Sequence, residues 1–243
     1  MLSDAVNVGI DKARLAGLFS SAEIVISEAQ AEQFAKYARL LVEWNQKINL
    51  TAITQPAEIE EKHFLDSCLP FADVDIPQNA SVADIGTGAG FPGIPLRIIH
   101  PDIELTLVDS LQKRINFLET ACAQIGVKAT AIHGRAEELG RSDMRESFDI
   151  ATARAVARLS VLCEYCLPFV KVGGLFVALK GRDCAEEIHL AYTAIKTMGG
   201  EIAKTIEYSL PSGDGRTAVI IKKIRPTPPA YPRTKAKMEK KPL

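Results

Sequence analysis

Residues 83–93 read Ala-Asp-Ile-Gly-Thr-Gly-Ala-Gly-Phe-Pro-Gly, and this stretch is the strongest indication of the fold. A short apolar run, SVADI at 81–85, leads into the glycines, and a helix-like run, FPGIPLRII at 91–99, follows them. A strand that ends in closely spaced glycines before a helix lets a ligand approach bare backbone amides at the helix start. Three glycines within residues 86–90 exceed what a tight turn alone requires. The stretch therefore predicts a ligand-binding loop between a strand and a helix.

Strand-like and helix-like runs alternate from this loop toward the end of the chain. The strand-like runs are SVADI (81–85), ELTLVD (104–109), KATAIH (128–133), FDIATA (148–153) and GGLFVALK (173–180). Strands that alternate with helices form a mostly parallel sheet with helices on both faces. Two final β-rich runs, 201–210 and 216–224, flank a short turn and predict an antiparallel hairpin. The sequence thus predicts an α/β, Rossmann-like fold with a mostly parallel seven-stranded sheet.

The chain divides into three regions by composition. Residues 1–75 form an N-terminal segment with helical periodicity, in which Ser27 is the expected N-cap of a helix. Residues 76–224 form the Rossmann-like domain. Residues 225–243 form a basic tail with five prolines and no apolar periodicity, and we expect no folded structure there.

The formal net charge of −1 hides an uneven distribution. The chain has 29 basic residues (Lys+Arg) and 30 acidic ones (Asp+Glu). Residues 222–243 hold eight of the basic residues and one of the acidic ones, so the first 221 residues hold 21 basic and 29 acidic residues, a net charge of −8. The composition of the tail predicts an extended arm that contacts RNA phosphates. The alternative is a solvated chain end that only aids solubility.

Several classes of protein are excluded by the sequence. No run of about 18 apolar residues exists, so we expect no membrane-spanning helix. The first 15 residues carry charges without an apolar core, which argues against a secretory signal. The five cysteines fit buried thiols in a cytoplasmic protein, and the Cys163-x-x-Cys166 pair alone does not complete a metal site. We expect a cytoplasmic monomer without a bound metal.

The glycine loop fits two cofactors. Gly88, Gly90 and Gly93 satisfy the dinucleotide pattern G-x-G-x-x-G, which supports NAD. However, the carboxylate of Asp84 would face a pyrophosphate unfavourably, whereas it suits the ammonium or sulfonium group of S-adenosylmethionine. Asp109 ends the second strand and can accept hydrogen bonds from ribose hydroxyls of either cofactor. The combination favours S-adenosylmethionine.

The rest of the sequence limits which kind of atom can accept the methyl group. Residues 148–155 read FDIATARA, without the Asn/Asp/Ser-Pro-Pro-aromatic segment common in enzymes that methylate exocyclic or amide nitrogens. No Pro-Cys step is present to supply the cysteine nucleophile that methylation of a pyrimidine ring carbon needs. The remaining acceptor is an atom that is already nucleophilic, such as N7 of guanine. Catalysis would then rest on positioning, which can contribute roughly 7–11 kcal/mol, and needs no general base.

Five motifs in order carry a resemblance to a known family: DIGTGAGFPGIPL, LVDSLQKRINFL, GRAEE, TARAVARL and ALKG. EWNQKINLTAI, KHFLDS and the C-terminal YPRTKAKMEKKPL extend the match to about residues 35–243. The chain resembles the glucose-inhibited division protein B family, methyltransferases that modify N7 of guanine 527 in 16S rRNA. The resemblance implies the class I S-adenosylmethionine-dependent methyltransferase fold, with 16S rRNA of the small ribosomal subunit as the partner.

The resemblance also implies site residues. It places cofactor contacts at Gly86, Phe91, Ala136, Glu137 and Arg154. The chemistry of the loop adds four cofactor-binding candidates, which are Asp84, Gly88, Gly90 and Asp109.

Arg154 and Lys180 are the candidate catalytic residues, because each ends a strand where α/β sheets bind their ligands. Arg154 would hold a phosphate, the methionine carboxylate or the guanine; the alternative is a structural ion pair with Asp84 or Asp149. Lys180 would contact RNA phosphate, and the alternative is a solvated strand end. Arg216, beside the glycine-rich hairpin turn, is a weaker candidate for RNA contact.

Two other functions stay open at this point. An NAD-linked oxidoreductase would use the Gly88, Gly90 and Gly93 loop, although no acid/base pair for hydride transfer is apparent. A non-catalytic RNA-binding protein that keeps the methyltransferase fold is the other, and the intact glycines and Asp109 argue against it.

Overall fold

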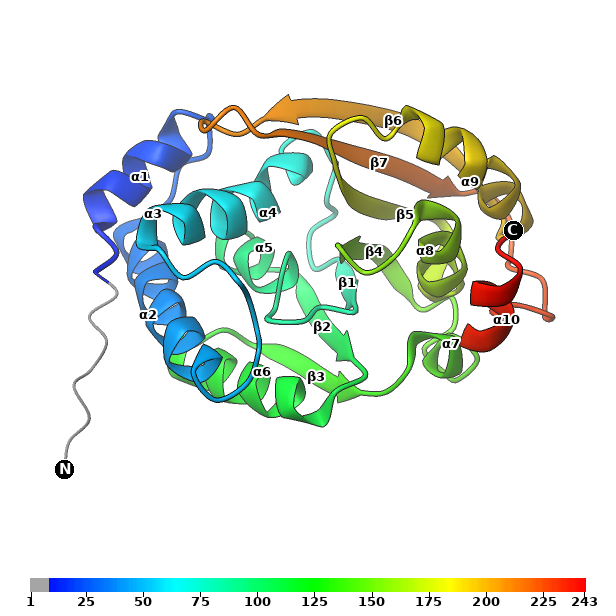
Figure 1. Ribbon diagram of the computed structural model, residues 1–243, viewed down its shortest axis with the longest axis horizontal. Coiled ribbons are helices and arrows are strands. Elements are labelled where there is room, and N and C mark those ends of the chain that lie inside the picture. Colours follow the sequence, from blue (N-terminus) through cyan, green and yellow to red (C-terminus); the bar gives the residue numbers. More distant parts are fainter. Residues whose placement is uncertain (1–8) are drawn as a thin grey trace.

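The computed structural model describes residues 9–243 and shows one seven-stranded sheet with helices on both faces (Figure 1). The strand order is β3-β2-β1-β4-β5-β7-β6. The strands are β1 (Ser81–Ile85), β2 (Glu104–Asp109), β3 (Ala129–His133), β4 (Phe148–Arg154), β5 (Val170–Gly181), β6 (Gly200–Ser209) and β7 (Gly215–Lys223). The first five run parallel, and β7 pairs antiparallel with both β5 and β6. The predicted fold, including the final hairpin, is confirmed.

The strand order reverses at β1. This strand lies between β2 and β4, so the chain leaves it in one direction toward β2 and β3 and later returns on its other side. In open α/β sheets, ligands bind outside the carboxyl ends of the strands at such a switch point. The glycine loop follows the carboxyl end of β1, so the topology alone locates a binding site there.

Alternate residues of the strands enter two hydrophobic clusters, one on each face of the sheet. Val82 and Val177 belong to the first cluster, whereas their neighbours Ala83 and Ala178 belong to the second. Figure 1 shows α1–α6 on one side of the sheet and α7–α10 on the other. The helices are α1 (Lys12–Ser20), α2 (Glu28–Asn45), α3 (Pro56–Glu58), α4 (Asp66–Cys68), α5 (Gly93–Ile99), α6 (Gln112–Ile125), α7 (Ala136–Leu139), α8 (Leu159–Cys166), α9 (Ala185–Thr197) and α10 (Lys235–Lys240).

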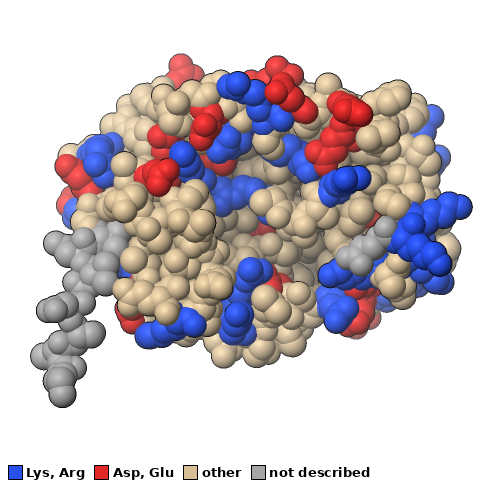
Figure 2. Space-filling model, viewed as in Figure 1, with Lys and Arg blue, Asp and Glu red and all other residues tan. Residues whose placement is uncertain are grey.

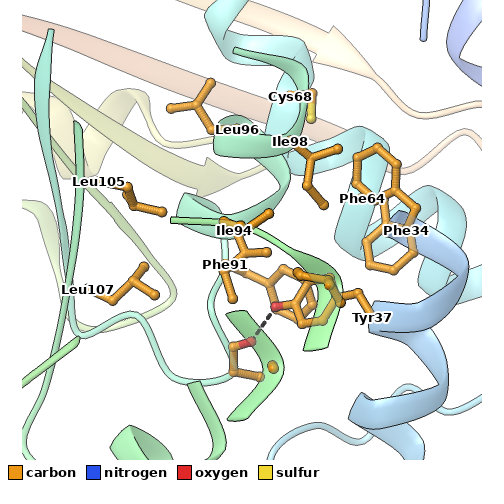
Figure 3. Packing of buried hydrophobic residues seen from close by; sticks show 14 of the residues in the cluster. Phe34, Tyr37, Phe64, Cys68, Phe91, Ile94, Leu96, Ile98, Leu105 and Leu107 are labelled. Atoms are coloured by element: carbon orange, nitrogen blue, oxygen red, sulfur yellow. Dashed lines mark hydrogen bonds between the residues drawn. The ribbon is translucent and has the colours of Figure 1, made fainter. Parts of the chain in front are cut away.

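The described part of the N-terminal segment shares a core with the sheet. The side chain of Ser27 accepts from the backbone of Gln30 in a capping box at the start of α2, as its N-cap role predicts. Phe34 and Tyr37 of α2 pack close to Phe64 and Phe91, and Figure 3 shows these aromatic rings side by side. Residues 1–8 of the predicted 1–75 segment lie outside the described residues.

The helical run after Pro56 is continuous but not uniform. It comprises α3, a π-helix η1 (Ile59–Leu65), α4 and a 3₁₀ turn η2 (Leu69–Phe71). The wider π-helical turn is uncommon and is frequent at functional sites. The KHFLDS sequence, residues 62–67, contacts Arg154 at the carboxyl end of β4.

The basic tail is folded, so the prediction of no structure there is wrong. Arg233 donates to both carboxylate oxygens of Glu164, a buried residue of α8, and Met238 of α10 is fully buried. The side chains of Arg141 and Arg145 donate to backbone carbonyls between residues 227 and 232. The prolines that suggested disorder leave these carbonyls without helical or strand partners, and the two arginines satisfy them. Composition could not show this, because the partners lie about 70–90 residues away in the sequence.

No helix within residues 9–243 is both long and apolar enough to cross a membrane. The five cysteines are all buried thiols, and Cys163 and Cys166 lie inside α8 in the core, as predicted. Among the side chains that the structure describes, no group of three or more His, Cys, Asp or Glu is arranged to bind a metal ion.

Candidate functional site

The glycine loop joins β1 to α5 with its backbone in conformations that side chains rarely adopt. Gly86 and Gly90 have φ values of +69° and +97°. A Cβ on Gly90 would come 2.5 Å from Cδ1 of Ile94 and 2.6 Å from the hydroxyl oxygen of Tyr37. That hydroxyl donates a hydrogen bond to the carbonyl of Ala89, drawn in Figure 3. The loop is thus held against α2, and glycine at 90 is required for this close approach.

A cavity of about 440 Å³ opens beside this loop. Four of the predicted cofactor-binding residues line it together: Gly86, Asp109, Ala136 and Glu137. They come from the carboxyl ends of β1 and β2 and from the start of α7, so they are brought together only by the sheet. Among the lining residues that the sequence did not single out are Leu111, Val156, Ala157, Val161, Tyr165 and Lys235.

Asp109 fastens the loop after β1 to the loop after β2. Its Oδ2 accepts from the backbone N–H of Gly88 at 3.0 Å, and its Oδ1 accepts from that of Leu111 at 2.9 Å. Arg114 lies 3.3 Å from the same carboxylate. A carboxylate has about four acceptor positions, so contacts with ribose hydroxyls stay compatible with these bonds. Asp109 therefore shapes the cavity and also faces it.

Asp84 lies beneath the glycine loop and lines neither of the cavities described here. It is fully buried, and its Oδ2 accepts from Thr87 Oγ1 at 2.6 Å and from the backbone N–H of Gly93 at 2.8 Å. Its Oδ1 has no hydrogen-bond partner. Burial raises the pKa of this carboxyl to about 6, opposed by the bonds from Thr87 and Gly93. The structure thus shows Asp84 as a support of the loop.

Arg154 ends β4, and 15% of its side chain is exposed. Its guanidinium donates to the carbonyl of Lys62 at 3.1 Å, lies 3.3 Å from Nδ1 of His63 and forms an ion pair with Asp66 at 3.5 Å. Burial lowers the pKa of Arg154, and the nearby carboxylates of Asp66 and Asp84 counteract that shift. The two ion pairs considered from sequence, with Asp84 or Asp149, are not formed.

A second cavity, of about 340 Å³, lies beside Arg154, and we call it the polar cavity because several charged side chains line it. Lys180, Arg216, His63 and Asp66 line it with Arg154, so the structure brings both candidate catalytic residues and the weaker candidate Arg216 to one place. The carboxylate of Asp66 accepts from the hydroxyl of Tyr208 at 2.9 Å and from Nε of Arg216 at 3.3 Å. Asp66 thereby links the N-terminal segment, β4 and the C-terminal hairpin.

His63 and Asp66 were not predicted as site residues. The imidazole of His63 stacks on the Phe91 ring with 4.4 Å between centroids, and its Nε2 lies 2.8 Å from Thr51 Oγ1. Burial and the adjacent Arg154 lower the pKa of His63 to about 3, so the ring is neutral at physiological pH. Both residues belong to the KHFLDS motif, which supported the family resemblance. The motif alone did not indicate that His63 and Asp66 contact Arg154.

Lys180 is the penultimate residue of β5, and only 13% of its side chain is exposed. Its ammonium pairs with Glu187 at 2.7 Å and donates to the carbonyl of Ala157 at 3.0 Å. The alternative of a solvated strand end is therefore wrong. Contact with an RNA phosphate stays a prediction.

The remaining predicted residues, Phe91, Gly88 and Gly90, contact residues of the site but do not line its cavities. Phe91 is buried between His63, Tyr37 and the guanidinium of Arg154, whose carbon lies 4.9 Å from the ring centroid. Gly88 and Gly90 line neither of these cavities, although Gly88 donates to Asp109. Their direct contact with a cofactor stays a prediction.

Solved structures with the same architecture define the class. The structure is similar to a SAM-dependent methyltransferase from Aquifex aeolicus, with a TM-score of 0.54 and 14% identity over 75% of this chain and 98% of that one. It is also similar to TrmN from Thermus thermophilus, with a TM-score of 0.52 and 15% identity over 68% of this chain and 53% of that one. At such identities the likeness shows the fold alone, and the fold is that of the class I methyltransferases.

Sequence similarity identifies the family within that class. The model of the GidB family, described as rRNA small subunit methyltransferase G, matches residues 30–211. The chain is 50% identical to ribosomal RNA small subunit methyltransferase G of Alkaliphilus oremlandii, over 90% of this chain and 93% of that protein. It is 47% identical to the protein of the same name from Brevibacillus brevis, over 96% and 99%. The chain belongs to the rRNA small subunit methyltransferase G family.

Family membership confirms the predicted resemblance and the methyltransferase function, and it agrees with S-adenosylmethionine as the cofactor. Neither the oxidoreductase nor the non-catalytic RNA-binding protein finds support among these relatives.

Proposed function

We propose that this chain transfers the methyl group of S-adenosylmethionine to N7 of guanine 527 in 16S rRNA of the small ribosomal subunit. The observation that carries the proposal is the pair of cavities on either side of Arg154 and the loop that follows it. One cavity is built from the glycine loop and the strand ends where α/β sheets bind their ligands, and the other is lined by Arg154, Lys180 and Arg216 together with Asp66. A methyl donor in the first and a base in the second would meet at the end of β4.

The cofactor cavity has the chemistry that S-adenosylmethionine requires. The bare backbone at Gly86 lets a ligand approach closely, and the carboxylates of Asp109 and Glu137 provide acceptors for hydroxyl or amino groups. The aliphatic side chains of Leu111 and Val161 line the same cavity and suit an adenine ring. When bound, the cofactor supplies an electrophilic methyl group on a sulfonium centre.

The polar cavity suits a guanine whose N7 faces the cofactor. Guanine presents O6 next to N7, and both are acceptors that arginine commonly binds. A guanidinium that donates to O6 alone, from Arg154 or Arg216, would hold the base and leave the N7 lone pair free. N7 carries no proton, so the reaction needs no general base. His63 agrees with this, because its pKa of about 3 makes it a weak base and its ring is held in a stack on Phe91.

RNA attraction is expected to be local, because the chain carries a formal net charge of only −1. Figure 2 shows Lys and Arg side chains around the central hollow of this face and gathered near α10. We propose that these cations contact rRNA phosphates, and that the protein acts in the cytoplasm as a monomer without a metal. Size-exclusion chromatography with light scattering tests the monomer; a stable dimer would contradict it.

A direct test uses purified protein, labelled S-adenosylmethionine and small ribosomal subunits that lack the modification. Mass mapping of the 16S rRNA is expected to show one added methyl group at guanine 527, and chain cleavage specific for 7-methylguanine should assign N7. Methylation of another nucleotide would contradict the proposed target. Binding of NAD in place of S-adenosylhomocysteine in a thermal-shift assay would contradict the proposed cofactor.

A further inference from the structure

The loop that joins β4 to α8, residues 155–158, separates the two cavities. Val156 and Ala157 line the cofactor cavity, and Ala155 lines the polar cavity. If the proposed function holds, the methyl donor and the base lie on opposite sides of this loop. The position of the loop then sets the distance and angle between the reacting atoms.

The loop does not hold its conformation by itself. Ala155 has a φ of +56°, in the left-handed region that is strained for a non-glycine residue. The Val156 side chain lies against the glycine loop so closely that a Cβ on Gly86 would come 2.8 Å from its Cγ2. Such a conformation persists only where the surrounding structure fixes it.

Two charged residues from outside the loop fix it. Lys180 of β5 donates from Nζ to the carbonyl of Ala157 at 3.0 Å. Oε1 of Glu187, on α9, accepts from the backbone N–H of Leu159 at 2.5 Å and pairs with Lys180 at 2.7 Å. The ion pair therefore holds the backbone at Ala157 and at Leu159, on both sides of Arg158.

Glu187 also caps α8 in place of a local residue. Arg158 is the N-cap of that helix, and its side chain makes no capping bond. A carboxylate that accepts from the first helical N–H satisfies one unpaired donor and lies near the positive end of the helix. The start of α8, and with it the end of the loop, is thereby fixed to α9.

We propose that Lys180 and Glu187 are positioning residues for methyl transfer, which act through the 155–158 loop and do not contact the RNA. The ammonium of Lys180 is largely enclosed, donates to the Ala157 carbonyl and is paired with Glu187, so an RNA phosphate would have to displace one of these partners. This assigns Lys180 a different role from the phosphate contact expected from sequence.

The test compares Lys180→Met, Lys180→Arg and Glu187→Gln with the wild-type chain. We expect Lys180→Met and Glu187→Gln to weaken S-adenosylhomocysteine binding, measured by calorimetry, and to lower kcat, each about tenfold, with KM for small ribosomal subunits changed less than about twofold. Lys180→Arg should recover most of the loss, because a guanidinium can donate to both Glu187 and the Ala157 carbonyl. Lys171→Met is the matched control, since Lys171 pairs with Asp149 at the opposite end of the same strand.

The outcomes separate the possible roles of Lys180. A rise in KM for the subunits, with unchanged S-adenosylhomocysteine binding, would overturn the proposal and assign Lys180 to RNA contact. Wild-type behaviour of both Lys180→Met and Glu187→Gln would overturn it as well. Melting temperatures of each variant are measured alongside, and the Glu187→Gln variant keeps an oxygen acceptor for Leu159, so it isolates the ion pair. A wild-type protein that binds no S-adenosylhomocysteine would overturn the proposed function itself, whatever the variants do.

Discussion

The guanidinium carbon of Arg154 lies 4.9 Å from the centroid of the Phe91 ring, and the imidazole of His63 stacks on the same ring at 4.4 Å. Three parts of the chain meet in this contact: the end of β4, the glycine loop and the π-helix η1. A cation over an aromatic face contributes about 2 kcal/mol when it is shielded from solvent. The contact therefore connects the glycine loop to Arg154, which lines the polar cavity.

We expect Arg154→Lys to lower methyl transfer by about a hundredfold, because an ammonium cannot reproduce the planar set of contacts to Lys62, His63 and Asp66. The measurement is kcat with small ribosomal subunits, accompanied by the melting temperature. Arg39→Lys, on the exposed face of α2, is the control and should leave kcat unchanged. An Arg154→Lys enzyme with wild-type kcat would contradict a positioning role for the guanidinium.

Removing the hydroxyl of Tyr37 should loosen the glycine loop. Tyr37→Phe leaves the ring in the core but takes away the donor to the Ala89 carbonyl, a loss of about 1–3 kcal/mol for a buried group. We expect a lower urea midpoint and weaker S-adenosylhomocysteine binding. Tyr192→Phe is the control, because Tyr192 is exposed on α9. Equal effects of the two substitutions would show that the bond to Ala89 does not matter.

The buried carboxyl of Asp84 predicts a particular pH dependence of stability. Its pKa is raised from 3.8 to about 6, so between these values the folded chain holds a proton that the unfolded chain has released. The stability from this group is therefore greatest below pH 3.8 and is lost as the pH rises through 6, by about 3 kcal/mol in total. Relative to the wild type, Asp84→Asn should gain stability from pH 4 to 7 and then level off. A constant difference across that range would show that Asp84 titrates normally.

The central sheet could be predicted because its signals are local. The strands SVADI and ELTLVD coincide with β1 and β2, and the short turn after residue 210 predicted the hairpin. The residues around Arg154 could not be predicted in the same way. His63 contacts Arg154 across 91 residues of sequence, and only the path of the helical run over the sheet brings them together. For the same reason the enclosed ion pair of Lys180 could not be predicted, since Glu187 and Ala157 approach it from other elements.

The folded tail changes what its deletion should do. From sequence, loss of residues 226–243 would weaken RNA binding and leave cofactor affinity unchanged. In the structure Lys235 lines the cofactor cavity, and Arg233 is the cation paired with the buried Glu164 at 2.7 Å. Deletion is therefore expected to weaken S-adenosylhomocysteine binding and to lower the melting temperature. Wild-type values of both in the truncated chain would restore the prediction from sequence.

The point variant Arg233→Met isolates the ion pair. It leaves a buried carboxylate without its partner, which costs about 3–5 kcal/mol, and we expect urea denaturation to show a loss of that size. The double variant Arg233→Met/Glu164→Gln should recover part of it, because the uncompensated charge is then removed. Lys237→Met, an exposed change on α10, is the matched control for loss of a tail cation. If Arg233→Met were no less stable than this control, the ion pair with Glu164 would not contribute to the stability of the folded tail. The tail would then be held by the buried side chain of Met238 and by the hydrogen bonds that Arg141 and Arg145 donate to its carbonyls.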